Sequence, residues 1–485
     1  MTKTMFWNSN AVVDDDNVFF YPIEEGDISP NDLEKFVNYH RSKLLPNYIK
    51  LRNYYKGKHK ILKESAKESW KPDNRLLYNF PKKLVNTFGG FFLGTPARID
   101  IDNANGEESD GSLDDWLESV NFDDVNFEVS KQIDIYGRSH YFVYQNEGSE
   151  TRLVAVDPRN AFVIYSNDVE KKPLFAVVYS IDNKNNGING TLYTNTGNYV
   201  FKMLPSMGCQ IYSDPIDDIK PFGDNIQLIE AYSNEERQGL FEDALNIIDG
   251  INHEMSEKAN DFDAQADSIL KIIGAKMKDD KRVQVRSNKT LEIPNVAPGT
   301  TVDVDYINKA SNDAMQEHLI DRNVDYLYQT TGIANLNDET FGTASGVALE
   351  YKLQPMSNLA DMKARKMTPA IKRVIKTAFS AIRTMDAKSK VLDHLDDINI
   401  KFIKTTPRNV SDEAETLNKL LDSGKVSPET ALKVVSIIDD PEKELKRVAA
   451  SQQEDIEHAQ EIADKFAIDA DKSGVTNEAN SSSKE

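Results

Sequence analysis

Two long amphipathic stretches on either side of a short β-rich segment constrain this fold more than any other feature. The first begins at Ser233-Asn234-Glu235-Glu236, which has the form of a capping box. Its apolar residues recur on one helical face: Leu240, Ala244, Ile247, Ile251, Met255, Ala259 and Phe262. A helix of about 28 residues is about 42 Å long at 1.5 Å per residue, which exceeds the width of a small domain. This helix must therefore protrude from its domain or span it.

The second stretch runs from about Asn312 to Gly332 and returns the chain to the domain it left. Between the two, residues 270–309 have the composition of short strands, with Pro294, Pro298 and Gly299 as turns. We therefore predict an antiparallel helix pair with a small β lobe at its far end. The residues predicted to pack the pair are Leu240, Ile247, Ile251 and Met255 on the first helix and Met315, Leu319 and Val324 on the second.

The remaining patterns predict an α+β protein around this axis. Residues 1–26 show little periodicity and are predicted to form a flexible arm, whereas Ile28-Ser29-Pro30-Asn31-Asp32 begins a helical pattern. Residues 137–229 contain β-branched and aromatic runs between turn signals, which predicts an antiparallel sheet in a mixed α/β domain. The helical pattern over residues 347–385 contains Pro355 and Pro369, which we expect to kink or break it. A strand at 398–403, short helices from Ser411 to about Phe466 and a disordered tail follow.

Charge and composition exclude several classes of protein. The 485 residues include 58 Lys and Arg against 79 Asp and Glu, a formal net charge of −21. Such a chain is not expected to wrap nucleic acid along its whole surface, so any DNA contact must be local or weak. A single cysteine, Cys209, excludes an internal disulfide and is typical of a cytosolic protein. The apolar runs are too short to cross a bilayer, so no membrane association is predicted.

No motif in the sequence predicts catalysis, a metal site or a cofactor. The seven histidines are isolated from one another and from Cys209. The glycine-rich segment over residues 89–95 lacks the Lys-Ser/Thr step of a phosphate-binding loop, which favours helix packing and a turn. Paired aspartates such as Asp396-Asp397 could hold magnesium, although a solvated surface is the simpler interpretation.

Local charge is more informative than the total. Residues 235–267 carry ten acidic side chains against Arg237 and Lys258, whereas residues 271–292 carry seven basic side chains against three acidic ones. The helical pattern over residues 347–385 is also basic, and its cations include Lys363, Arg365, Lys366, Lys372 and Arg373. Each run is also compatible with an ordinary exposed face.

Several segments together resemble one protein family. They are Asn79-Phe80-Pro81-Lys82-Lys83-Leu84-Val85-Asn86, Ile135-Tyr136-Gly137-Arg138-Ser139, Val156-Asp157-Pro158, Thr330-Thr331-Gly332-Ile333-Ala334-Asn335-Leu336 and Ser345-Gly346-Val347-Ala348-Leu349. With their order along residues 27–465, they are similar to portal proteins of tailed bacteriophages of the siphophage, SPP1-like type. The resemblance implies a non-enzymatic ring, usually of twelve subunits, through which double-stranded DNA is packaged and later ejected.

The resemblance also implies a portal fold with named parts. Carried onto this chain, they are an arm at 1–26, a wing at 27–233 and 386–407, stem helices at 234–269 and 310–331, a β-rich clip at 270–309, a tunnel loop at 332–346, a kinked tunnel helix at 347–385, a helical crown at 408–465 and a disordered tail at 466–485. In a ring, the apolar stripe of the stem would also pack against the adjacent subunit.

Site residues and partners follow from the same resemblance. The tunnel loop would present Asn335, Asn337, Asp338, Glu339, Thr340, Phe341, Thr343 and Ser345 to DNA, together with the basic residues of the tunnel helix. The clip would dock the terminase large subunit and then a head-completion or tail adaptor through Lys276, Lys278, Lys281, Arg282 and Arg286. The implied location is the capsid portal vertex of the virion, among major capsid and scaffolding proteins, after assembly in the host cytoplasm.

Two other classes stay open at this point. A carboxylate-metal nuclease of the packaging apparatus would need convergent acidic residues and magnesium-dependent cleavage. A generic capsid or scaffold component would lack a channel.

Overall fold

The computed structural model describes residues 5–6, 11–22, 27–68, 71–101, 111–182, 186–212, 222–266, 269–273, 301, 303–307, 313–336, 346–385, 389–405, 410–422, 424–434, 444–451 and 453. The chain divides into two units, residues 1–405 and residues 406–485. The fold is mixed α+β, as the sequence predicts.

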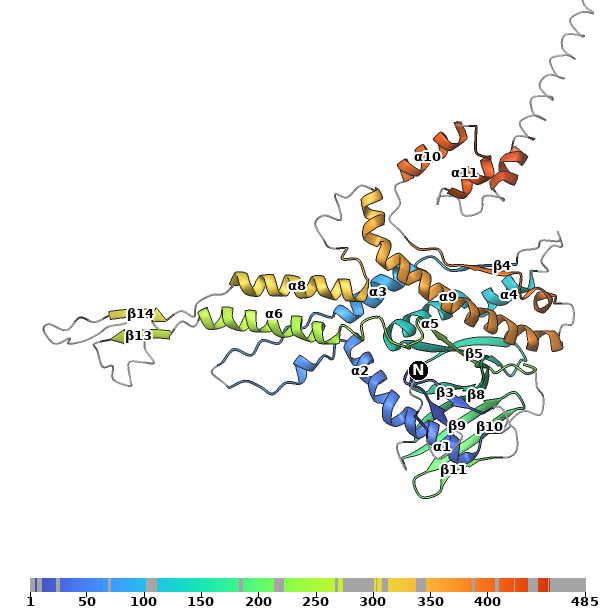
Figure 1. Cartoon of the computed structure of the whole chain (residues 1–485), viewed down its shortest axis with the longest axis horizontal. Coiled ribbons are helices and arrows are strands. Elements are labelled where there is room, and N and C mark those ends of the chain that lie inside the picture. The colour runs from blue at the N-terminus through green and yellow to red at the C-terminus, as the bar shows by residue number, and fades with distance from the viewer. Residues whose placement is uncertain are drawn as a thin grey trace, which may run out of the picture. The chain divides into compact units, whose positions relative to one another are not determined.

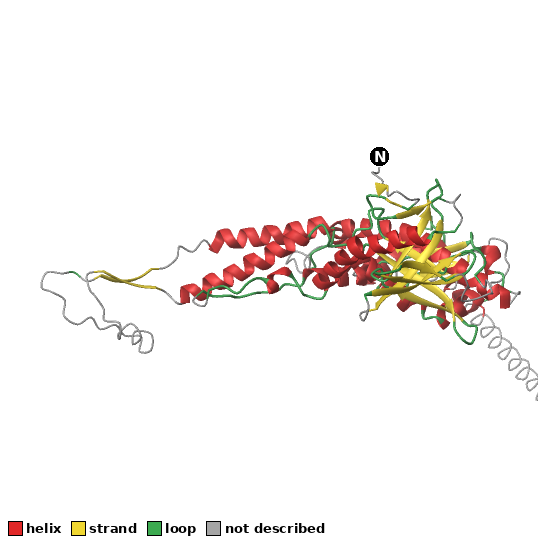
Figure 2. Ribbon diagram, turned by 90° about the horizontal axis from the view of Figure 1, so that it is seen from below, coloured by secondary structure: helices red, strands yellow, loops and turns green. Residues whose placement is uncertain are grey.

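Two sheets lie at the centre of the first unit (Figure 1 and Figure 2). The larger has the order β1-β2-β3-β7-β8-β9-β10-β11 and the smaller the order β12-β5-β6. Their strands are β1 (Met5–Phe6), β2 (Val12–Val13), β3 (Phe19–Tyr21), β5 (Arg138–Gln145), β6 (Thr151–Val156), β7 (Ala161–Ser166), β8 (Pro173–Asp182), β9 (Gly187–Thr194), β10 (Asn198–Leu204), β11 (Gly208–Ile211) and β12 (Leu228–Tyr232). Between residues 137 and 229 the paired strands are antiparallel, which confirms the predicted sheet.

The prediction of a flexible N-terminal arm is wrong for residues 11–22. β3 pairs in parallel with β7, and Phe19 and Tyr21 are 1% and 2% exposed. The ring of Phe19 meets those of Phe36 and Phe162 edge to face, with centroids 5.3 and 4.8 Å apart. These strands are too short to show a period-2 pattern, and their stability comes from residues far along the chain.

The helices of the first part of the chain are α1 (Pro30–Tyr39), α2 (Leu45–Tyr55), α3 (Phe80–Leu93), α4 (Ser112–Ser119) and α5 (Phe122–Tyr136). α1 contacts β11, and α5 contacts β5, β6 and β12. α1 begins as predicted, because the Ser29 hydroxyl accepts a hydrogen bond from the Asp32 N–H at 3.1 Å. The sequence analysis does not predict α4 and α5. The buried face of α5 contains Asn126, Ser130 and Asp134, and these polar residues hide its apolar periodicity.

Shorter helical turns connect some of these helices. A π-helical turn over His40–Leu44 joins α1 to α2, and 3-10 turns cover Lys60–Lys63 and Val391–His394.

The predicted helix pair is present as α6 (Leu245–Ala266) and α8 (Asp313–Thr331), which lie side by side in both views (Figure 1 and Figure 2). Gly332 follows α8 with a φ of 67°, a left-handed conformation that suits glycine at a helix end. The strands β13 (Ile269–Ile273) and β14 (Asp303–Ile307) form an antiparallel ribbon. The other strands predicted between residues 274 and 300 lie outside the described residues.

The predicted start of the first long helix is wrong, because α6 begins at Leu245 and residues 233–244 form turns. Arg237 has a φ of 53°, and the Asn234 side chain bonds to the Gln238 backbone instead of capping a helix. A Cβ atom at Gly137 would lie 1.8 Å from the Arg237 carbonyl oxygen, so the turn packs directly on the end of α5. The chain bends here because the Arg237 side chain reaches Glu230, which is buried and pairs with Arg138.

Helix α9 (Gly346–Met385) continues through both Pro355 and Pro369 as one helix, and Figure 1 shows that it bends along its length. The prolines therefore do not break it. After α9, β15 (Ile398–Lys401), which lies in the predicted strand at 398–403, pairs antiparallel with β4 (Arg98–Ile101).

The described part of the second unit contains α10 (Val410–Asp422) and α11 (Pro428–Val434). The Ser427 hydroxyl accepts a hydrogen bond from the Thr430 N–H at 3.2 Å and so caps the start of α11.

Candidate functional site

The α6–α8 pair is held by polar contacts as well as apolar ones. The Asn323 amide donates to both carboxylate oxygens of Glu254 at 3.0 Å, and the Gln316 amide donates to Asp261 at 3.3 Å. Lys258 pairs with Glu317. Apolar contact is concentrated near the base of the pair, where Ile251 is 1% exposed.

The structure divides the predicted packing residues into two groups. Leu240, Ile247, Met255 and Val324 are partly buried against the main core, in which Ile251 lies. Met315 and Leu319 are 70% and 48% exposed, which corrects the expectation that they pack against the first helix of the same chain. α8 turns Gln316, Ile320 and Asn323 toward α6, and Met315 and Leu319 lie about a quarter turn away on the helix.

An extended segment lies along the other side of α6; we name residues 56–68 and 71–79 the strap. Three buried side chains at successive turns of α6 accept hydrogen bonds from alternate N–H groups of the strap. The pairs are Asn252 with Tyr78 at 2.8 Å, Ser256 with Leu76 at 2.9 Å and Asn260 with Asn74 at 2.6 Å. Four helical residues advance about 6.0 Å and two extended residues about 6.6 Å, so the two repeats nearly match.

The buried end of this ladder includes His59. Its Nε2 donates to the Tyr54 carbonyl oxygen at 2.9 Å, and its Nδ1 accepts from the Asn252 amide at 3.0 Å. Burial lowers the pKa of His59, which keeps the ring neutral and compatible with both bonds. The sequence patterns do not predict the strap. Its signal in the sequence is the Asn-Ser-Asn spacing on α6, together with a lysine-rich stretch that has no apolar period.

Lys363 lies in the core, so its prediction as an exposed tunnel cation is wrong. Its Nζ donates to Asp134 at 2.7 Å and to the Ser130 carbonyl oxygen at 3.1 Å. The same atom lies 5.2 and 5.0 Å from the ring centroids of Phe88 and Phe92. Burial raises the pKa of Asp134 and lowers that of Lys363, although the pairing opposes both shifts. This pair joins the middle of α9 to α3 and α5.

The other predicted cations of α9 lie nearer the surface. Arg365 and Arg373 are exposed, whereas Lys366 and Lys372 are half-buried. Lys366 pairs with Glu235, in the turns before α6.

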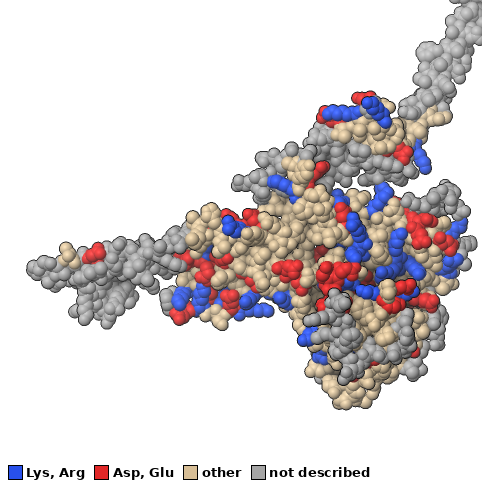
Figure 3. All heavy atoms as spheres, viewed as in Figure 1, with Lys and Arg blue, Asp and Glu red and all other residues tan. Residues whose placement is uncertain are grey.

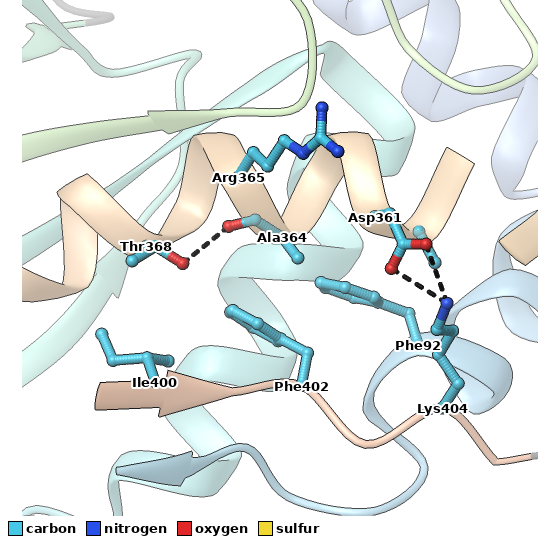
Figure 4. A pocket seen from close by; sticks show the side chains of 9 residues that line it. Phe92, Asp361, Ala364, Arg365, Thr368, Ile400, Phe402 and Lys404 are labelled. Carbon is cyan, nitrogen blue, oxygen red and sulfur yellow. Dashed lines mark hydrogen bonds and ion pairs between the residues drawn. The ribbon is translucent and has the colours of Figure 1, made fainter. Parts of the chain in front are cut away.

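A hollow of about 290 Å³ lies between α9, α3, β15 and the residues that follow β15 (Figure 4). Phe92 and Phe402 stack at its base with centroids 4.9 Å apart, and Asp361 pairs with Lys404 at 2.9 Å on its rim. Figure 4 shows Arg365 directed away from these rings.

A second buried charge cluster explains the turns before α6. Glu230 pairs with Arg138 at 3.2 Å and accepts a hydrogen bond from the Tyr165 hydroxyl at 2.6 Å. Arg237 approaches the same carboxylate at 3.9 Å, and its guanidinium lies 3.8 Å from the Tyr232 ring centroid. Burial opposes the charged carboxylate, but the two arginines hold the pKa of Glu230 below its usual value.

Much of the predicted DNA-facing and docking set lies outside the described residues. Within the tunnel loop, Asn335 is described and half-buried. The predicted residues that lie outside the described ones are Asn337, Asp338, Glu339, Thr340, Phe341, Thr343, Ser345, Lys276, Lys278, Lys281, Arg282 and Arg286.

The described residues contain no group of three His, Cys, Asp or Glu side chains that could hold a metal ion. None of their helices is long and apolar enough to cross a membrane.

Comparison with known proteins gives two matches. A family model described as "Phage portal protein, SPP1 Gp6-like" matches residues 34–458. The chain is also similar to the portal protein of Bacillus phage SPP1, with 22% identity over 442 residues, which cover 87% of this chain and 83% of the relative.

Proposed function

The chain belongs to the SPP1 Gp6-like family of phage portal proteins, and from that membership we propose how its parts serve a DNA channel. Portal proteins of this family act in DNA packaging and head–tail connection as structural channel proteins of the virion, not as enzymes. We propose a ring of twelve subunits at the capsid vertex, in which α6 and α8 form the stem and β13 and β14 belong to the clip.

The family match carries this proposal, because it covers residues 34–458 and so includes the stem, clip, tunnel loop and tunnel helix and most of the wing and crown. The order of elements supports it, since one long helix leads to a two-stranded ribbon and a second helix returns. At about 1.5 Å per residue, the 22 residues of α6 extend about 33 Å, enough to hold the ribbon away from the sheets.

The channel surface is proposed to include the tunnel loop from Asn335 to Ser345 and the exposed arginines Arg365 and Arg373. Amides, hydroxyls and isolated cations can contact phosphates without reading the base sequence. With a net charge of −21, most of the surface repels DNA, so the channel would confine it and grip it weakly. The nuclease alternative is not retained, because the family is non-enzymatic.

The clip is proposed to dock the terminase large subunit during packaging and a head-completion or tail adaptor afterwards. Reversal of Lys281 and Arg282 to Glu should then reduce binding of either partner, most strongly at low salt. Reversal of two exposed lysines on the wing, Lys43 and Lys202, is the matched control. Equal binding by both variants at low salt would contradict this part of the proposal.

Imaging the purified full chain by negative stain tests the ring itself. We expect rings with an axial hole; a monomer or a solid particle at every salt concentration would contradict it. Large substitutions such as Asp338→Trp should leave these rings intact but reduce DNA packaging by the assembled head. Normal packaging by such rings would remove the tunnel loop from the channel.

A further inference from the structure

The strap presents basic and apolar side chains together on the outside of the stem. Lys56, Lys58, Lys60 and Lys63 are exposed and form no ion pair with a described residue. Three apolar residues of the strap are also exposed: Leu62 by 45%, Leu76 by 37% and Tyr78 by 40%. In Figure 3, Lys and Arg side chains lie along the lower edge of the region that holds α6 and the strap, with acidic side chains between them. We call these seven residues the strap edge.

α8 presents a surface of the opposite charge. Met315, Leu319 and Tyr326 are 70%, 48% and 50% exposed, and their spacing places them on one helical face. Asp321 and Asp325 lie on the side of α8 that faces away from α6, are exposed and form no ion pair with a described residue. Arg322 lies between these aspartates and the apolar side chains. The formal charges of Asp321, Arg322 and Asp325 therefore sum to −1. We call this surface the α8 stripe.

The strap and α8 contact opposite faces of α6. The strap bonds to Asn252 and Ser256, whereas α8 bonds to Glu254 and pairs with Lys258. Positions two residues apart on a helix are rotated by about 200°, so these contacts face away from each other. One chain therefore carries two different uncovered surfaces on separate sides of its stem.

We propose that the strap edge of one copy binds the α8 stripe of the next copy, head to tail, and that this contact closes the stem part of the ring. The inference rests on the proposed ring and names the surfaces that join it. Both surfaces expose apolar side chains, and the four lysines of the strap edge face a net charge of −1 on the α8 side, which favours their mutual contact over contact with themselves. A contact between two different surfaces is heterologous, and heterologous contacts generate a ring when the rotation from one copy to the next closes.

Other occupants fit less well. A two-fold dimer through the strap edge would bring lysines against lysines, which is unfavourable. DNA would use the lysines but would leave the exposed Leu and Tyr side chains and the whole α8 stripe uncovered.

Charge exchange tests the proposal with the full chain. The strap variant carries Lys60→Glu and Lys63→Glu, and the stripe variant carries Asp321→Lys and Asp325→Lys. Each variant alone should lose the ring peak in size-exclusion chromatography at a concentration where wild type forms rings. An equal mixture of the two should recover rings, since each altered surface then meets its complement, and one chain with all four changes should also assemble.

Controls separate misfolding from loss of contact. The reversed residues have no ion-pair partner among the described residues, so circular dichroism spectra and melting temperatures should match wild type. Lys43→Glu with Lys202→Glu makes the same charge change on the wing and should leave rings intact.

Two outcomes overturn the proposal and leave the ring itself standing: each variant assembles alone, or folded variants fail to assemble both in the mixture and in the combined chain. Strap-variant rings that form normally but retain less DNA would assign the strap edge to DNA instead. If wild type forms no rings at any salt concentration, the proposed function fails before this contact is tested.

Discussion

Replacing Lys363 by Met removes one partner of the most deeply buried ion pair that connects α9 to the body of the first unit. Lys363 and Asp134 are 1% and 3% exposed, and the second carboxylate oxygen of Asp134 finds no hydrogen-bond partner among the described residues. Met keeps the unbranched shape of the side chain and its contact with the Phe88 and Phe92 rings. Asp134 would keep a desolvated carboxyl group without its cation.

The cost follows from this burial. Breaking a fully buried pair by removing one partner costs about 3–5 kcal/mol, because the remaining charge is uncompensated. The double variant Lys363→Met with Asp134→Leu removes both charges and both desolvation costs. Such replacements range from neutral to about 1–4 kcal/mol more stable. The single variant should therefore be the least stable of the three proteins.

Urea unfolding at pH 7, followed by circular dichroism under conditions that keep the chain unassembled, gives the three unfolding free energies. Asp134→Leu alone is a second single variant and should be destabilised through the unpaired ammonium group. The reasoning is refuted if Lys363→Met unfolds within about 0.5 kcal/mol of wild type, or if the double variant is as unstable as the single one.

Three further predictions concern other parts of the first unit. Gly137→Ala should lower the melting temperature more than Gly223→Ala. Both glycines have positive φ, but a Cβ at Gly137 would also lie 1.8 Å from a backbone carbonyl oxygen, whereas one at Gly223 would meet open space. The difference between the two melting temperatures measures the clash. Burial lowers the pKa of His40 to about 3, below its value in the unfolded chain. The unfolded state therefore binds the proton first as pH falls. Through this group the free energy of unfolding should decrease by about 1.4 kcal/mol per pH unit between pH 6 and pH 4. A His40→Gln variant, compared by urea titration at each pH, should lose that part of the slope, and an unchanged slope would contradict the assignment. Ile251→Ala should lower the free energy of unfolding by about 2–5 kcal/mol, because the side chain is 1% exposed. Leu319→Ala should leave the unfolding of a single chain nearly unchanged but weaken ring assembly. Equal effects of the two variants on unfolding would place Leu319 in the core.

Local chemistry made part of this fold predictable. Caps such as Ser29 and Ser427 act on N–H groups two or three residues away, so the sequence contains both partners of the interaction within one helical turn. The strands of residues 137–229 and the existence of a long helix pair also follow from side-chain period. Those patterns supported the resemblance to portal proteins, which the family match confirms.

The candidate surfaces were less predictable. Net charge along the sequence made Lys363 equivalent to Arg365, although one lies in the core and the other on the surface. The strap showed no apolar period, because its order comes from hydrogen bonds to α6 and not from a buried face of its own.

The sequence by itself determined the strands of residues 137–229, the cap of α1 at Ser29 and the order of helix, ribbon and returning helix. Only the tertiary structure decided where α6 begins, which cations are buried and which faces of the stem stay exposed. Each of these depends on a partner far along the chain: Arg237 leaves the helical pattern to reach Glu230 and Arg138, and Lys363 bonds to Asp134. Periodicity reports which residues of one segment share a face, but the free energy of a buried charge depends on the groups that other segments bring to it.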